Sequence, residues 1–245
     1  MQRILALLDP GREPQPAVAA AEKLAARFDA EVLQAVDLDS IERLAPDLVV
    51  SFSAWQSPLQ RTLFTADDWR LIRECRVPVL LVKDPALLTK PRILACVDPT
   101  HSGDKPAALD HRLLDEAERF ARALDGEVRV LHVLTHRHSF AVAGDAYVTP
   151  VPAAETGRAG IEQADLALRE LLAAHPAFVE HGRVRIGTPA DEIVAEAQEQ
   201  RASLVVMGTV ARGRLERWIV GSTAEGTLDR LACNVLVIKP VTHTQ

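Results

Sequence analysis

Features that mark disulfide-rich, secreted or membrane proteins are scarce in this chain. Its 245 residues include three cysteines, Cys75, Cys96 and Cys233, which show neither CxxC spacing nor an even-numbered framework. Such a set favours buried, reduced thiols in a cytoplasmic protein. The five apolar residues between Arg3 and Asp9 are too few for the apolar region of a signal peptide. No apolar run approaches the roughly 18 residues of a membrane span, so we expect no membrane association.

Positive charge is also in short supply. The chain has 28 Lys and Arg against 34 Asp and Glu, a net charge of −6, and no basic stripe. This balance argues against nucleic acid as a partner. Hydrophobic residues make up 48% of the chain, which is enough for a sizeable core.

Common catalytic motifs are missing. The sequence has no GxSxG elbow, no HExxH helix, no Walker A loop and no carboxylate pair suited to acid and base catalysis. His132, His136 and His138 lie close in sequence, but without a cysteine or carboxylate at metal-ligand spacing. We therefore predict no catalytic residue and no metal ligand.

What the chain does contain is an internal repeat. The segment 3–10, RILALLDP, returns as 92–99, RILACVDP, with six of eight residues identical. Residues 48–50 and 79–83 return 156 positions later, with no gap between the two matches. Two copies of one folding unit can be compared with each other, and the comparison shows which features each copy has kept.

The second copy reads as alternating strands and helices. Short apolar runs predict strands, and apolar residues spaced by three and four predict helices. The strands are expected over 93–97, 128–133, 184–186, 204–207 and 235–238. The helices are expected over about 108–124 and 157–174, from Pro189 with Thr188 as the N-cap, and from a capping box at 222–225. This order predicts a doubly wound parallel sheet.

The first copy has the same ends and a shorter middle. Its expected elements are strands over 4–8, 31–36, 48–50 and 79–82, a helix over about 16–28 and a helical remnant over 39–45. About a dozen residues connect its second strand to its third, whereas the second copy uses about 70. We therefore predict two tandem Rossmann-like or flavodoxin-like α/β units: a truncated domain over 1–85 with about four strands, and a complete domain over 86–245 with five.

The richest local signal is the segment 207–223, which lies between a buried strand and a capped helix. Backbone N–H groups and the positive end of a helix dipole favour phosphate at such a place. Its glycines allow close approach of a ligand, and Ser222 can both cap the helix and donate its hydroxyl. Asp98 ends the strand expected beside it, at the crevice where open α/β sheets bind ligands.

These residues resemble the universal stress protein family. The pattern is Gly-x-x-Gly/Ala, nine residues, Gly-Ser, together with Val-Asp-Pro after the first strand, and the resemblance covers essentially the whole chain as a tandem pair. Residues 207–212, MGTVAR, with a downstream Thr-Ala-Glu, and residues 64–71, FTADDWRL, are similar to the tandem, E-type branch.

The resemblance implies a nucleotide site in the second copy. Asp98 would lie near adenine and Val133 would line the base pocket. The positions that would hold ribose and phosphates are Gly208, Ala211, Gly221, Ser222 and Thr223. Nucleotide-binding members have a glycine where this chain has Ala211, and an added methyl group there would exclude or loosen phosphate. The alternative is structural: both glycines serve only turns, and Ser222 serves only as an N-cap.

The first copy has lost this loop. A shift of 156 aligns Phe52 with Gly208 and Trp55 with Ala211. We expect the two aromatic rings to fill or cover the crevice, and the first copy to bind no phosphate.

Three functions remain open. The preferred one is a cytoplasmic, non-catalytic universal stress protein acting as a regulatory binding module with a degenerate adenine-nucleotide site. The first alternative is an ATP-binding sensor or slow ATPase that uses the second copy, and the second is a carrier of a small apolar ligand. No cofactor is required, and ATP or another adenine nucleotide is the candidate ligand. The resemblance further implies an intramolecular pseudo-dimer with strands 79–82 and 235–238 side by side, and homodimerisation is an open alternative.

Overall fold

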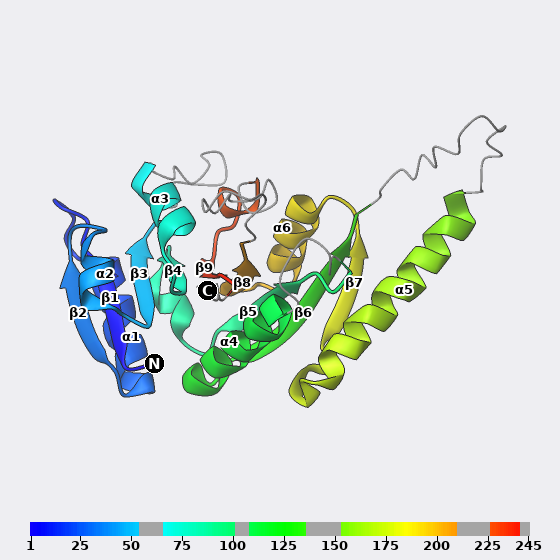
Figure 1. Ribbon diagram of the computed structural model, residues 1–245, viewed down its shortest axis with the longest axis horizontal. Helices are drawn as coiled ribbons and strands as arrows, with labels where there is room; N and C mark the ends of the chain where they lie inside the picture. The colour runs from blue at the N-terminus through cyan, green and yellow to red at the C-terminus, as the bar shows by residue number, and fades with distance from the viewer. Residues whose placement is uncertain (54–65, 101–107, 136–152, 210–225, 241–245) are drawn as a thin grey trace, which may run out of the picture.

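A single mixed sheet organises the chain. The computed structural model describes residues 1–53, 66–100, 108–135, 153–209 and 226–240 (Figure 1). The described strands are β1 (Arg3–Leu7), β2 (Glu31–Ala35), β3 (Leu48–Phe52), β4 (Val79–Val82), β5 (Arg92–Val97), β6 (Glu127–Leu134), β7 (Gly182–Ile186), β8 (Leu204–Gly208) and β9 (Asn234–Ile238). They form one nine-stranded sheet in the order β2-β1-β3-β4-β9-β8-β5-β6-β7.

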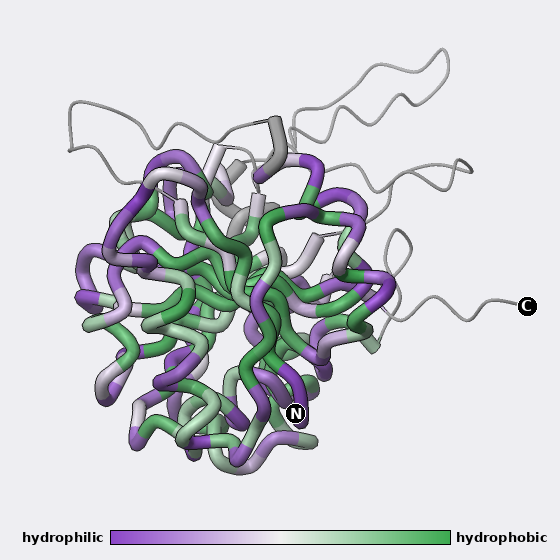
Figure 2. The backbone as a smooth tube through the Cα atoms, turned by 90° about the vertical axis from the view of Figure 1, so that its left-hand side faces the viewer, coloured by the Kyte–Doolittle hydropathy of each residue, from purple (hydrophilic) through white to green (hydrophobic). Residues whose placement is uncertain are grey.

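Helices cover both faces of this sheet. The described α-helices are α1 (Pro16–Phe28), α2 (Ser40–Leu44), α3 (Ala66–Glu74), α4 (Ala108–Leu124), α5 (Ala153–Ala173) and α6 (Pro189–Glu199), with 3-10 turns η1 (Pro85–Leu88) and η2 (Pro176–Phe178). Helices α1, α4 and α5 pack on one face of the sheet, and α3 and α6 pack on the other. Each face has one apolar cluster between the sheet and its helices. Hydrophobic backbone segments gather inside the molecule and hydrophilic ones at its periphery (Figure 2). The predicted doubly wound α/β fold is confirmed.

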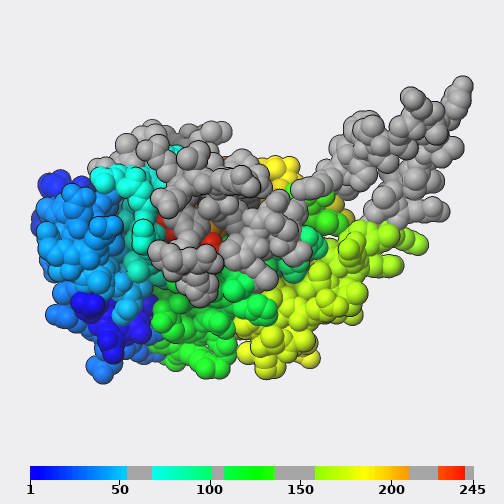
Figure 3. All heavy atoms as spheres, viewed as in Figure 1, coloured from blue at the N-terminus to red at the C-terminus, as the bar shows by residue number. Residues whose placement is uncertain are grey.

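The two halves meet at one antiparallel pair of strands. All other strand pairs of the sheet are parallel, but β4 runs antiparallel to β9. In this pair Leu80 lies opposite Leu236, which is its own counterpart at the shift of 156. The last strands of the two copies therefore lie side by side, as expected, around a local two-fold relation. In the space-filling view, the first residues of the chain lie at one end of the molecule and helix α5 at the other (Figure 3).

The first half is shorter, as the sequence predicts. Strands β1 to β4 correspond to β5, β6, β8 and β9 in order along the chain and in sheet position. Helix α5 and strand β7 have no counterpart among the described residues that precede 85. Helix α2 (Ser40–Leu44) is the remnant expected between the second and third strands. The division into two domains at residue 85 stays a prediction.

Polar contacts reinforce the junction between the halves. The buried Asn234 side chain accepts hydrogen bonds from the backbone N–H of Lys83 (2.8 Å) and of Asp84 (3.1 Å) and donates one to the Asp84 carbonyl (3.0 Å). The Lys83 ammonium donates to the carbonyls of Leu228 and Leu231. Each of these bonds joins residues more than 140 positions apart, so the halves are joined by more than strand pairing.

Local differences from the sequence prediction occur at element ends. Helix α5 begins at Ala153, four residues before the expected start. Thr188 occupies the N-cap position of α6 with Pro189 following, but the Thr188 side chain makes no capping hydrogen bond. The capping box at 222–225 lies outside the described residues. None of the described helices combines the length and apolar character that a membrane crossing requires.

Candidate functional site

The strand order defines a crevice in the second half. From β5 the chain passes through α4 to β6 on one side, and it later returns to β8 on the other side of β5. In open α/β sheets, ligands bind at the carboxyl edge where the strand order reverses in this way. Asp98 directly follows β5, and Gly208 ends β8. Since Ala95 lies opposite Val206, the register brings Asp98 level with Thr209. Two residues predicted for the site thus lie at one edge of adjacent strands.

Asp98 is held in a polar cluster and remains open to solvent. Its backbone N–H donates to Oδ1 of Asp110 (3.1 Å), and the Thr100 hydroxyl donates to its Oδ1 (3.1 Å). His132 Nδ1 lies 3.8 Å from Asp98 Oδ1 and 3.3 Å from the Val97 carbonyl oxygen. The Asp98 side chain is 42% exposed whereas that of His132 is 1% exposed. The Asp98 carboxylate is therefore positioned by Thr100 and lies close to the buried His132, and its exposed part is accessible to a ligand from solvent.

Asp110 is the residue of this cluster that sequence reasoning missed. It lies in the first turn of α4 beside Leu109 and is 4% exposed. Because buried carboxylates require hydrogen-bond donors, its contact with the Asp98 backbone fixes the turn after β5. A carboxylate within the apolar face of a helix was the available signal.

Val133 and Gly208, two further residues predicted for the site, both make packing contacts within the fold. Val133, next to His132 on β6, is partly buried and packs against the apolar cluster beneath α6. A Cβ atom at Gly208 would lie 3.0 Å from Leu109 Cδ2 and 3.5 Å from Leu113 Cδ1. Gly208 therefore allows α4 to approach β8 closely, which favours the structural alternative for this glycine.

The remaining predicted site residues cannot be placed. Ala211, Gly221, Ser222 and Thr223 lie outside the described residues, so their assignment to ribose and phosphates stays a prediction.

The equivalent crevice of the first half contains its own side chains. Arg12 Nε lies 2.7 Å from Asp9 Oδ2, and Asp9 is the twin of Asp98. The same guanidinium lies 4.4 Å from the centre of the Phe52 ring. A cation held over an aromatic face is a favourable contact. Arg12 thus pairs with Asp9 and packs on Phe52, while the Asp9 side chain remains 44% exposed. Trp55 lies outside the described residues.

One polar feature is shared by both crevices. Thr209 and its counterpart Ser53 directly follow β8 and β3, and both are 2% exposed. Within the described structure, neither hydroxyl has a hydrogen-bond partner. Because the feature recurs in both halves, it does not distinguish a binding site in the second one.

Metal-ligand chemistry has little support where the structure is described. Across residues 1–53, 66–100, 108–135, 153–209 and 226–240 there is no cluster of three His, Cys, Asp or Glu that could hold an ion. His132 faces the Val97 carbonyl, and His136 and His138 lie outside those ranges.

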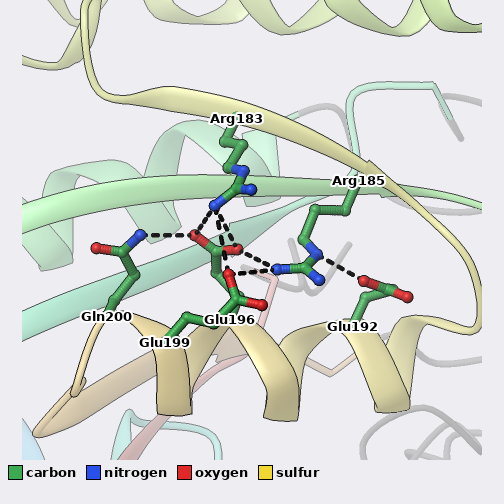
Figure 4. Close-up of polar contacts among 6 residues, drawn as sticks. All are labelled: Arg183, Arg185, Glu192, Glu196, Glu199 and Gln200. Atoms are coloured by element: carbon green, nitrogen blue, oxygen red, sulfur yellow. Dashed lines mark hydrogen bonds and ion pairs between the residues drawn. The ribbon is translucent and has the colours of Figure 1, made fainter.

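A separate charged cluster joins the edge strand β7 to α6 (Figure 4). Arg185 contacts Glu192 (2.5 Å), Glu196 (2.7 Å) and Glu199 (2.9 Å), and Arg183 lies 3.1 Å from Glu196. Burial opposes ionisation of Glu196, but hydrogen bonds from Arg185 and Gln200 outweigh it, so the pKa of this carboxyl is lowered. These ion pairs hold α6 against strand β7, and the three carboxylates are all paired with arginines.

Comparison with known proteins identifies the class. The model of the universal stress protein family matches residues 91–239. The chain therefore belongs to the universal stress protein family.

The relatives agree with the tandem, E-type resemblance. A universal stress protein E homolog of Haemophilus influenzae is 30% identical over 204 residues, which cover 82% of this chain and 65% of the relative. Universal stress protein E of Escherichia coli K12 is 30% identical over 203 residues, covering 79% of this chain and 61% of the relative. The chain thus spans less than two thirds of the length of these relatives.

Solved structures support the fold. A Pseudomonas aeruginosa protein of unknown function superposes with a TM-score of 0.76 at 21% identity, covering 98% of this chain and 93% of the other. A universal stress protein from Archaeoglobus fulgidus superposes with a TM-score of 0.59 at 19% identity, covering 97% and 88%.

Proposed function

We propose that this protein is a cytoplasmic, non-catalytic regulatory module whose second half binds an adenine nucleotide at the carboxyl edge of β5 and β8. The observation that carries the proposal is the solvent-accessible Asp98 carboxylate at the reversal of strand order, which accepts a hydrogen bond from Thr100 and whose backbone N–H donates to Asp110. An exposed carboxylate there can accept a hydrogen bond from the exocyclic amine of adenine. Family membership supports the same reading.

The comparison between the halves supports one site rather than two. Asp9 is engaged by Arg12, and Phe52 stands where the second half has Gly208. The twin aspartates therefore provide a matched pair, in which Asp98 contacts the nucleotide and Asp9 does not. The antiparallel register of β4 and β9, in which equivalent residues face each other, supports an intramolecular pseudo-dimer.

Release of bound material tests the ligand directly. The purified protein is denatured and the small molecules in the supernatant are identified by mass spectrometry. An adenine nucleotide that is present in the wild type and absent from Gly221→Trp supports the proposal. Its presence in equal amount in Gly221→Trp would place the nucleotide elsewhere.

A slow ATPase is the competing function in the same place. Phosphate release measured with excess ATP distinguishes the two: the binding module gives no release above a protein-free blank. Release that depends on Asp98 would replace our proposal with the enzyme. For an apolar carrier the described cavities are unsuitable, since one of about 370 Å³ and another of about 480 Å³ are lined mainly by charged side chains.

A further inference from the structure

A second candidate site lies at the opposite edge of the sheet from Asp98. A cavity of about 370 Å³ opens between the amino-terminal ends of β5 and β6 and the turn that follows α6. We call it the amino-edge pocket. Its charged lining consists of Arg92, Arg129, Arg201, Glu127 and Glu199.

Within the part of the chain that the structure describes, the arginines of the amino-edge pocket have no carboxylate partner. Among the described residues, no ion pair within 4.0 Å involves Arg92, Arg129 or Arg201. By contrast, Arg183 and Arg185 on strand β7 contact three glutamates of α6 (Figure 4). Of the two acidic groups in the lining, Glu199 already contacts Arg185 at 2.9 Å.

The side chains that line the amino-edge pocket therefore carry a net positive charge. The C-terminus of α6 adds a negative partial charge, equivalent to about half an elementary charge, and Glu127 adds a full one. With Glu199 counted as well, the three guanidinium groups leave a positive balance of about half an elementary charge in the lining. Like charges around one cavity repel each other, and a bound anion relieves that repulsion.

The first half shows that the fold does not need two of these cations, Arg129 and Arg201, whereas Arg92 recurs there as Arg3. In the sheet register Arg129 lies opposite Leu94, and the equivalent residue opposite Leu5 is Leu33. Leu33 packs against the apolar cluster of its face. An aliphatic side chain thus satisfies this position in one half, and an arginine occupies it in the other.

The same comparison holds for the turn after α6. Arg201 has φ +49°, and its counterpart Ala45, after α2, has φ +42°. A left-handed conformation is least costly for glycine or asparagine. The chain places a long cationic side chain there instead, beside the cavity, although alanine adopts the same backbone in the first half.

We propose that the amino-edge pocket binds a small multivalent oxyanion, a compound with two or more phosphate or carboxylate groups. Guanidinium forks match both groups in bidentate geometry. The volume lies at the lower end of the range for small-molecule sites. This site is distinct from the nucleotide crevice, because it lies at the other ends of the strands.

Calorimetric titration of the full chain tests the proposal with two probes, inorganic pyrophosphate for phosphate compounds and citrate for carboxylates. We expect one of them to bind with a Kd below about 1 mM at low ionic strength, and the one that binds identifies the ligand class. Raising the salt concentration from about 50 to 200 mM should weaken binding severalfold, since exposed charges are screened. Failure of both probes to bind overturns the proposal.

The comparison between the two halves indicates which substitutions to make in the amino-edge pocket. Arg129→Leu and Arg201→Ala introduce residues that the first half carries at the equivalent positions, and each should weaken probe binding at least tenfold. Arg169→Ala on α5 makes the same change in net charge at a residue paired with Asp165, and should alter the Kd less than twofold.

A final control separates this site from the nucleotide crevice. Gly221→Trp should leave probe binding unchanged. Binding that is lost in Gly221→Trp and retained in Arg129→Leu would assign the probe to the nucleotide crevice and overturn the proposal. A thermal melt of each variant verifies that the chain is folded.

Discussion

Two buried lysines should make the stability of this protein rise with pH. Lys83 and Lys239 are counterparts at the shift of 156, and they directly follow the two strands that join the halves. Their side chains are 9% and 1% exposed. Burial lowers the pKa of each from 10.5 to about 8. The unfolded chain therefore holds more protons than the folded one between about pH 8 and 10.5.

The magnitude follows from linkage. Where the unfolded state binds one more proton, the free energy of unfolding rises by about 1.4 kcal/mol per pH unit. Between pH 8 and 9 the two lysines together contribute a rise of about 2 to 3 kcal/mol. Burial also raises the pKa of the thiols of Cys75, Cys96 and Cys233, the last from 9.0 to about 11, which gives the opposite slope as the unfolded thiols ionise. The three thiols together offset about 1 kcal/mol of the rise between pH 8 and 9, so the lysines dominate the net slope in this window.

Urea denaturation at pH 7.5, 8, 8.5 and 9 measures the effect. The wild type should become more stable across this series, Lys83→Met should lose at least half of the rise, and the double variant with Lys239→Met should show no rise. Lys90→Met, at an exposed lysine outside the junction, serves as the control and should keep the full slope. A free energy of unfolding that stays flat in the wild type, or a slope that persists in the double variant, would refute the reasoning.

Three further predictions concern stability. Asn234→Ala should lower the free energy of unfolding by about 2 to 4 kcal/mol in urea, because it leaves backbone groups after β4 without partners; a loss below about 1 kcal/mol contradicts this. Gly126→Ala places a Cβ 2.5 Å from the Pro91 carbonyl oxygen, and thermal unfolding should show a loss of about 1 to 3 kcal/mol rather than no change. Arg185→Met should cost about 1 to 3 kcal/mol at pH 7, since it removes a partner of buried Glu196. That cost should shrink as the pH falls below 4.5, where this carboxyl becomes protonated in the unfolded chain and then in the folded one, and an equal cost at pH 3.5 would contradict the assignment.

Elements with strong local signals could be predicted from the sequence. The helices over 16–28 and 108–124 have the expected bounds, because each has an apolar face at helical spacing and a clear end. Strand β7 was predicted over 184–186 but begins at Gly182, since its arginines face α6 rather than a hydrophobic core. Edge strands of this kind carry little apolar periodicity.

Contacts between distant segments could not be predicted in the same way. The repeat located Asp98 and its twin Asp9, but it gave no sign that Arg12 would cover Phe52. Asp110 stood out only as a carboxylate on the apolar face of a helix, which did not indicate its partner, and the burial of Lys83 depends on the approach of the other half. Such contacts depend on tertiary packing, which a single sequence does not encode in any local pattern.

The twin aspartates test the central claim most directly. ATP is titrated calorimetrically into the wild type, Asp98→Ala and Asp9→Ala. The account predicts one binding site per chain, lost or weakened at least tenfold in Asp98→Ala and unchanged in Asp9→Ala. Two sites per chain, or equal affinity in all three proteins, would contradict the claim that nucleotide binding belongs to the second half alone.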